Sequence, residues 1–351
     1  MKHPPGHHGS DRSPIEVESR PDDGLEHFLA YWGLGRRRVL PWILGLITLS
    51  ALIAIVAHFS SIERFIELAR GSRPQWMFLA CVTQTLTYVC AATVWRQALR
   101  RAGHPHSLRS LFPLGVAKLF VDQAIPSGGA SGTLLVVRGL TRRHVRLHLA
   151  MAAMLVGLVS YDAAYLIAVL GSAGILWLHD RADLAPVAAV SIFACIVVMI
   201  PVAVLVLKNR VDHVPIAWLQ KMPGVATLLN ALAKAPTDLL RDTALLIQAI
   251  SLQLGIFLLD ATTLWIAFRA VGLAVDFWIV VVSFIIASMT ATIAPIPLGL
   301  GTFEAASVGM LRLLGVPIEA AFAATLLLRG FTFWLPMLPG LWLAKREIGQ
   351  L

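Results

Sequence analysis

Seven long apolar runs constrain this chain more than any other feature of its sequence. Four runs carry no charged residue, and each of the other three carries one: Asp162, Asp260 or Arg329. A helix needs about 20 such residues to cross the hydrocarbon core of a bilayer, whereas a helix of a soluble protein shows a polar stripe. The sequence therefore predicts membrane-embedded helices in the runs 39–59, 75–95, 149–178, 184–207, 244–268, 277–294 and 320–344.

Composition narrows the class of function. The chain is 57% hydrophobic and 14% charged, whereas about a quarter of a soluble protein is charged. Its three cysteines fall inside apolar runs, without the spacing of a metal site or a disulfide framework. The net charge of +9 comes from bases that flank the runs, as in loops beside anionic lipid. No P-loop, nucleophile elbow or HExxH motif is found. We therefore expect no catalytic residue, metal, cofactor or nucleic-acid partner.

Residues 1–38 form a segment of their own, rich in Pro, Gly, His, Ser and Asp and ending in three arginines. The composition predicts a disordered cytoplasmic tail. His3, His7 and His8 are a weaker hint of metal binding, which is less favoured than a solvated tail. The run that follows has no cleavage site and is expected to be a retained anchor.

Charge predicts the topology. With Arg36–Arg38 in the cytoplasm, the inferred cytoplasmic segments hold seventeen Lys or Arg against five outside. This asymmetry is typical of an inner-membrane protein of bacteria with both termini cytoplasmic. The longest internal segment, 208–243, carries Val225, Leu228, Leu229 and Leu232 at the spacing of an interfacial amphipathic helix.

Two apolar stretches are interrupted by turn residues. The stretch 111–140 is broken at 126–132, and 277–316 is broken at 295–301. The basic clusters on both sides of the first stretch face the cytoplasm only if the chain enters and leaves on the same side. We therefore expect re-entrant helical hairpins. The alternative is that Pro and Gly kink two ordinary helices, which membrane proteins tolerate.

The two breaks share a motif, Ile-Pro-x-Gly, at Ile125–Gly128 and Ile296–Gly299. Each break lies between two full spans, and the two units have opposite orientations, as in transporters with inverted repeats. The expected fold is an all-α polytopic membrane protein with about six full spans and two re-entrant hairpins. Its single transmembrane domain covers 39–346, with repeats at about 75–178 and 244–344.

Glycine-rich turns in a membrane predict an anion site. Exposed backbone N–H groups form anion-binding nests, and half-helices starting near Gly132 and Thr302 would aim positive dipole ends at the same region. A phosphate-bearing headgroup is the expected ligand, with Arg138, Arg312 and Lys118 as sources of counter-charge.

Charged residues within the runs complete the candidate site, because each is costly in lipid. Arg329 is expected to bind phosphate or carboxylate, or to pair internally with Asp162, Asp260 or Glu304. The two aspartates are alternatively proton relays, and Glu304 favours a helix start in any case. The predicted headgroup site comprises Arg329, Glu304, Asp122, Gln123, Pro126, Gly128, Gly129, Gly132, Arg138, Pro297, Gly299, Gly301, Asp162 and Asp260.

At these motifs the chain resembles the lysylphosphatidylglycerol synthase transmembrane-domain family, the flippase-like membrane part of the multiple-peptide-resistance factors. The stretch 295–304 (PIPLGLGTFE) carries most of the likeness, followed by 314–317 (LGVP) and 328–336 (LRGFTFWLP). The first turn, 121–129 (VDQAIPSGG), is similar to the N-terminal half of the family. The resemblance covers about 39–345 and implies a stand-alone lipid flippase.

This sequence departs from the family pattern at three places. Leu298 stands where the family often has Gly, and 157–162 (GLVSYD) stands where it often has a Glu-Arg pair. Arg329 is therefore expected to lack a mate in the first repeat. Family members that aminoacylate lipid carry a large soluble C-terminal domain, and this chain stops at Leu351, so synthase activity is not expected.

Three functions are compatible with these features. The first is a translocase for a phospholipid or an isoprenoid-linked lipid. The second is a non-catalytic partner that presents lipid to a separate glycosyl- or aminoacyltransferase. The third and least favoured is an embedded lipid transferase using Asp122, Asp162 or Asp260 as base.

Overall fold

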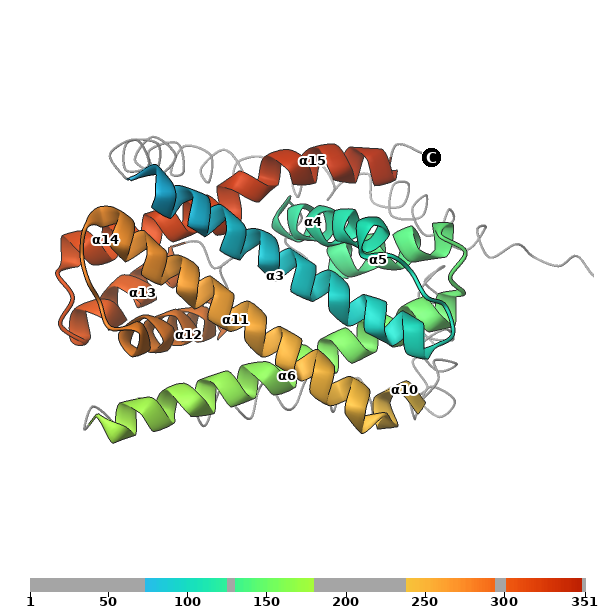
Figure 1. The fold of residues 1–351 in the computed structure, drawn as a ribbon, viewed down its shortest axis with the longest axis horizontal. Helices are drawn as coiled ribbons and strands as arrows, with labels where there is room; N and C mark the ends of the chain where they lie inside the picture. Colours follow the sequence, from blue (N-terminus) through green and yellow to red (C-terminus); the bar gives the residue numbers. More distant parts are fainter. Residues whose placement is uncertain (1–72, 125–129, 180–237, 294–300, 349–351) are drawn as a thin grey trace, which may run out of the picture.

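The computed structural model describes residues 73–124, 130–179, 238–293 and 301–348, and every regular element within these ranges is helical (Figure 1). Three long helices are α3 (Pro74–Arg101), α6 (Leu147–Leu178) and α11 (Thr243–Val271). A fourth consists of α14 (Ile318–Arg329), the π-helical turn Gly330–Trp334 and α15 (Leu335–Ile348). The shorter helices are α4 (Leu108–Ala124), α5 (Ala130–Arg142), α10 (Asp238–Arg241), α12 (Phe277–Ile293) and α13 (Thr302–Leu313).

The four long helices are long and apolar enough to cross a membrane, over Pro74–Arg101, Leu147–Leu178, Thr243–Val271 and Ile318–Ala344. Large apolar side chains such as Phe78, Trp177 and Leu338 are more than two-thirds exposed on them, a surface suited to lipid rather than water. The chain is a polytopic membrane protein. Four of the six predicted full spans form such helices. The other two (39–59 and 184–207), the tail and most of 208–243 lie outside the described residues.

Helices α3 and α11 pack side by side and antiparallel. The Thr83 and Thr263 hydroxyls lie 2.8 Å apart. Further along, Arg101 at the end of α3 pairs with Asp242, the residue that caps the start of α11. The last turn of α3 and the first turn of α11 therefore lie at the same end of the molecule.

Helix α6 runs in the same direction as α11. The side-chain amide of Gln253 donates to the Gly157 carbonyl at 3.5 Å, and one turn further the Phe257 ring stacks on Tyr165 at 5.1 Å. Residues further along α6 thus contact residues further along α11, as expected for two helices that run in the same direction. Helix α6 begins at the end of the molecule where α3 ends.

The fourth long helix runs in the same direction as α3. Phe331, just after α14, is buried against Ala80 near the start of α3. Ala344 in α15 belongs to the buried cluster that contains Leu99 near the end of α3. The four long helices therefore form two pairs of opposite direction, α3 with α14–α15 and α6 with α11.

The short helices form two pairs that lie toward opposite ends of this bundle (Figure 1). Helices α4 and α5 pack together and connect the end of α3 to the start of α6. Helices α12 and α13 pack together and connect the end of α11 to the start of α14. Within the described residues the four have 17, 13, 17 and 12 residues, against 28, 32 and 29 in α3, α6 and α11.

The buried apolar residues divide between these two ends. One cluster joins α4 and α5 to the end of α3 and the first half of α6. The other joins α12, α13 and α14 to the second halves of α6 and α11. Each short pair is thus packed into the bundle by its own core.

A glycine allows α15 to approach α4 closely. A Cβ atom on Gly340 would lie 2.6 Å from the Phe120 Cβ and 3.3 Å from the Val116 carbonyl oxygen. We expect Gly340→Ala to lower the free energy of unfolding by about 1–3 kcal/mol, because both contacts are too tight to relax easily. Gly255→Ala is the matched control, since a Cβ there meets nothing within 4 Å. Denaturant unfolding in micelles measures both, and equal effects would contradict the close approach.

Candidate functional site

The start of α13 holds a carboxylate in a fixed position. Gly301 precedes the helix with φ +81°, a conformation that glycine adopts without strain. Its backbone N–H donates to Glu304 Oε2 at 2.7 Å. Glu304 therefore satisfies one of the free N–H groups at the helix start and places its negative charge at the positive end of the helix dipole.

The second oxygen of Glu304 binds Arg329. The Arg329 Nε donates to Glu304 Oε1 at 2.6 Å, and the two side chains are only 16% and 20% exposed. The guanidinium also lies over the Phe303 ring at 4.7 Å and near the Phe333 ring at 5.8 Å. These aromatic faces stabilise the cation. A charged pair of this kind, held by α13 and α14, is well suited to exchange partners with an anionic ligand.

Arg329 is also the last residue before a change in helix geometry. The π-helical turn Gly330–Trp334 follows it directly. Single π-helical turns inside α-helices are frequently found at functional sites. The turn brings Phe333 to the same guanidinium that Phe303 covers.

A second charged pair lies at the start of α5. The Asp122 carboxylate accepts the Gly132 N–H at 2.9 Å and the Lys118 ammonium at 2.5 Å. Asp122 and Lys118 are spaced i, i+4 on α4, which places both on one face. A Cβ on Gly132 would lie 2.6 Å from the Asp122 carboxyl carbon. Glycine is therefore what allows the carboxylate to reach the backbone of the facing helix.

The two pairs share one arrangement. In each, a carboxylate accepts a backbone N–H at the start of the second short helix and binds a base. In one the acid comes from the helix itself, Glu304, and in the other from the preceding helix, Asp122. The helix starts that the sequence predicted as phosphate sites are thus neutralised by the protein's own carboxylates.

A polar cluster joins α3 to α11 within the membrane-spanning region. The Gln84 amide donates to Asp260 Oδ1 at 2.9 Å and to the Thr263 hydroxyl at 3.0 Å, and Thr83 bonds Thr263. Sequence reasoning singled out Asp260 but missed the other three residues. Gln84 was the available signal for this cluster, because it is an amide in an otherwise apolar run. Its partners on α11 could not be identified from sequence spacing.

Asp162 lies apart from both charged pairs, at the middle of α6. It is buried, and its Oδ2 atom accepts no hydrogen bond from any described residue. The adjacent Tyr161 lies within electrostatic range of both Asp162 and Asp260. Of the three acids weighed as partners for Arg329, the structure assigns Glu304.

The remaining predicted residues divide into three groups. Gln123 lies on α4, and Arg138 lies half-buried on α5, where no described residue binds its side chain. Arg312 is exposed in the last turn of α13, at the far end of that helix from Gly301. The predicted residues that lie outside the described ranges are Pro126, Gly128, Gly129, Pro297 and Gly299.

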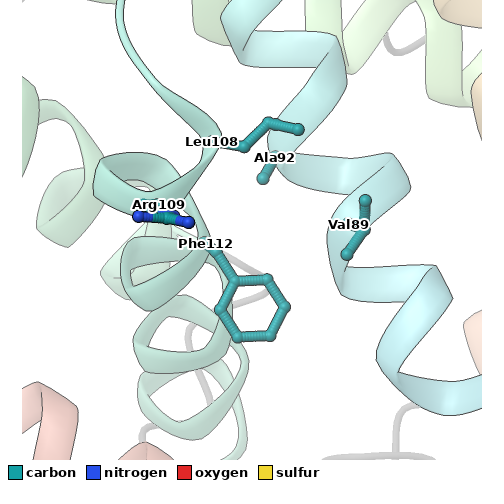
Figure 2. Close-up of a pocket in the computed structure, with 5 residues that line it drawn as sticks. All are labelled: Val89, Ala92, Leu108, Arg109 and Phe112. Atoms are coloured by element: carbon teal, nitrogen blue, oxygen red, sulfur yellow. The ribbon is translucent and has the colours of Figure 1, made fainter. Parts of the chain in front are cut away.

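A cavity of about 360 Å³ lies between α3 and the start of α4, away from these charges. Figure 2 shows Val89 and Ala92 of α3 facing Leu108 and Phe112 of α4 across it, with Arg109 beside them. Its lining is almost wholly apolar, and it includes none of the predicted site residues. It offers space to an acyl chain but no site for chemistry.

Comparison with known proteins gives consistent matches. The sequence profile of the lysylphosphatidylglycerol synthase TM region matches residues 42–340. A UPF0104 membrane protein of Methanocaldococcus jannaschii is 21% identical over 323 residues, which cover 88% of this chain and 96% of that protein. A UPF0104 membrane protein of Methanothermobacter thermautotrophicus is 22% identical over 311 residues, covering 84% of this chain and 90% of that protein.

Proposed function

Because this chain belongs to the lysylphosphatidylglycerol synthase transmembrane-region family, we propose that it moves a lipid with an anionic headgroup between the two leaflets of a membrane. A phospholipid and an isoprenoid-linked lipid share the phosphate that such a site would recognise. The proposal rests on the charged pair Arg329–Glu304. Arg329 is a base in a membrane span, and a lipid phosphate could replace the Glu304 carboxylate that binds it.

We interpret the helices as two units of an inverted repeat, and this interpretation supports the proposal. The unit α3, α4–α5, α6 corresponds to α11, α12–α13, α14–α15, and the two units run in opposite directions. The packing between helices agrees: α15 contacts α4 of the first unit, and α6 contacts α12 of the second. We interpret each short pair as a re-entrant hairpin, which places its glycine-rich turn at membrane depth. Transporters built this way bind substrate where the broken helices meet.

The distribution of bases supports an orientation. The end of the bundle where α3 ends and α6 and α11 begin carries Arg100, Arg101, Arg142, Arg143, Arg146 and Arg241. An excess of Lys and Arg is typical of the cytoplasmic side. We therefore place this end, and with it the α4–α5 pair, at the cytoplasmic face of an inner membrane.

The two charged pairs suggest how headgroups are bound. A base left alone at membrane depth is unfavourable, and on this proposal Glu304 and Asp122 avoid this for Arg329 and Lys118 when no lipid is bound. A headgroup phosphate would displace the carboxylate and take its place on the base and the backbone N–H. The base is then paired before, during and after lipid passage, which keeps the barrier to exchange low.

Transport of labelled lipid in reconstituted liposomes tests the proposal. The double variant Arg329→Gln/Glu304→Gln removes both charges without leaving either one unpaired. We expect it to fold and to move lipid about 10–100-fold more slowly, since a hydrogen bond to a charged group contributes about 1.5–3 kcal/mol.

Arg312→Gln is the matched control, because Arg312 is an exposed base on α13. It is expected to leave transport unchanged. Undiminished transport by the folded double variant would contradict the site. Absence of transport by the unmodified protein would instead favour a role in presenting lipid to a separate lipid-modifying enzyme.

A further inference from the structure

A buried acid lies at the middle of α6 without an ion-pair partner among the described residues. Asp162 is 8% exposed, and its fully buried Oδ2 accepts no hydrogen bond from the part of the chain that the structure describes. An isolated carboxylate away from water is so unfavourable that such groups pair, bind a cation or take up a proton. The surroundings of Asp162 decide among these three outcomes.

Aromatic groups surround this part of α6. The Tyr161 ring lies 5.7 Å from Tyr165 and 5.5 Å from Phe257 of α11, and Tyr165 stacks on Phe257. These rings supply phenol groups and apolar faces but no positive charge. A metal ion such as Ca²⁺ needs six to eight oxygen ligands. Within the described ranges, no group of three or more His, Cys, Asp or Glu is close enough to hold a metal.

The helices packed against α6 bring no base to Asp162 among the residues described. Helix α12 has no titratable side chain. Helices α5 and α10 carry arginines but pack with the cluster around the first half of α6, before Asp162. Helix α3 contributes Tyr88, and its arginines Arg96, Arg100 and Arg101 are exposed. Helix α11 contributes the acid Asp260, which is near both Tyr88 and Tyr161, and its base Arg269 lies over the Trp265 ring. An ion pair between Asp162 and a base is therefore excluded among these residues. Proton uptake is the remaining one of the three outcomes.

Asp260 differs from Asp162 in one respect. Its Oδ1 accepts a hydrogen bond from the Gln84 amide at 2.9 Å, and this donor favours the ionised form. Two acids on neighbouring helices thus have different environments, one with a donor and one without. The two acids therefore differ in hydrogen bonding, although both lie in the membrane-spanning part of the bundle.

We propose that Asp162 is a proton-binding site in the middle of the membrane, which takes up one proton as a neutral carboxylic acid and releases it again as the carboxylate. Asp260 is the neighbouring acid, with the Tyr161 hydroxyl near both. The site is separate from the charged pairs that would bind lipid. If lipid moves as proposed above, proton release and uptake at Asp162 supply a means of coupling that movement to a proton gradient.

Labelling with dicyclohexylcarbodiimide tests the site without any transport assay. The reagent enters membranes and adds to protonated carboxyl groups, and the adduct is located by mass spectrometry of peptides from the full-length protein in nanodiscs. An ordinary Asp, with a pKa of about 3.9, is almost fully ionised at pH 7. We expect Asp162 to carry more than about tenfold the adduct of the exposed Asp276 at pH 7, with labelling that falls as the pH rises.

Two further measurements separate the alternatives. Asp162→Asn, which resembles the neutral acid, is expected to retain or raise the melting temperature, whereas loss of an ion-pair partner would lower it. Sodium ions are expected to leave labelling unchanged. The proposal is overturned if Asp162 stays unlabelled from about pH 5 to pH 9, or if sodium protects it, which would indicate a cation site.

Transport then tests the coupling alone. A pH gradient across liposomes is expected to change the rate of lipid movement by the unmodified protein but not by Asp162→Asn. If no variant moves lipid yet Asp162 is labelled as expected, the proposed transport function fails and the proton site stands. If lipid moves and Asp162 is never labelled, the reverse holds.

Discussion

Replacing Arg329 with alanine is expected to lower the free energy of unfolding by about 2–4 kcal/mol, somewhat less than breaking a fully buried ion pair from one side, because this pair is partly buried. The reason is that Glu304 keeps its charge at the start of α13 but loses the guanidinium nitrogen 2.6 Å away. The Phe303 and Phe333 rings also lose the cation that lies over them. Denaturant titration in bicelles, followed by circular dichroism, measures the change.

A double-mutant cycle separates the pair from the loss of side-chain volume. Arg329→Ala/Glu304→Ala is expected to be more stable than the sum of the two single variants predicts, because no charge is left unpaired. Arg312→Ala, at an exposed position on α13, provides the baseline for removing a base. Strict additivity in the cycle would show that the two side chains are not energetically coupled.

Gly132→Ala is expected to cause the second large effect, through Asp122. The new methyl group would overlap all three atoms of the Asp122 carboxyl group. The carboxylate must then leave the Gly132 N–H, and Lys118 loses a fixed partner. We expect a loss of about 1–3 kcal/mol, the range of overpacking and of an unsatisfied buried group. Thermal unfolding in detergent measures it.

The matched background for this variant is Asp122→Ala. Once the carboxyl group is gone, the same glycine substitution meets no obstacle there, and its cost is expected to fall to a few tenths of a kcal/mol or to reverse, since alanine favours helix. Gly171→Ala, where a Cβ meets nothing within 4 Å, controls for the change of residue type. An equal cost with and without Asp122 would show that the overlap is relieved elsewhere.

The sequence by itself determined the membrane class and most helix positions. Long uncharged runs form α-helices in lipid, because every backbone N–H and C=O group must find a hydrogen-bond partner within its own segment. The predicted runs 149–178 and 244–268 accordingly agree with α6 and α11 to within a few residues. The two broken stretches each contain two short helices, as the proline and glycine residues between them predict.

Part of the candidate site consists of residues that are close to one another in the sequence. Lys118 and Asp122 are four residues apart on one helix, and Glu304 lies three residues after Gly301 at a helix start. Such spacings are visible in the sequence because helix geometry relates them directly. Arg329 was identified because a charged side chain is unfavourable in a membrane span, and its partner was not known from the sequence.

Only the tertiary structure decided which groups meet. Three acids were equally available to Arg329, and the packing of α13 on α14 selected Glu304. The Gln84–Asp260 bond joins residues 176 positions apart, and the contact of Gly132 with Asp122 depends on how closely α4 and α5 approach. Lipid provides no hydrophobic force between helices, so close packing at small residues chooses their neighbours. That choice depends on whole helix surfaces, which spacing along one chain does not reveal.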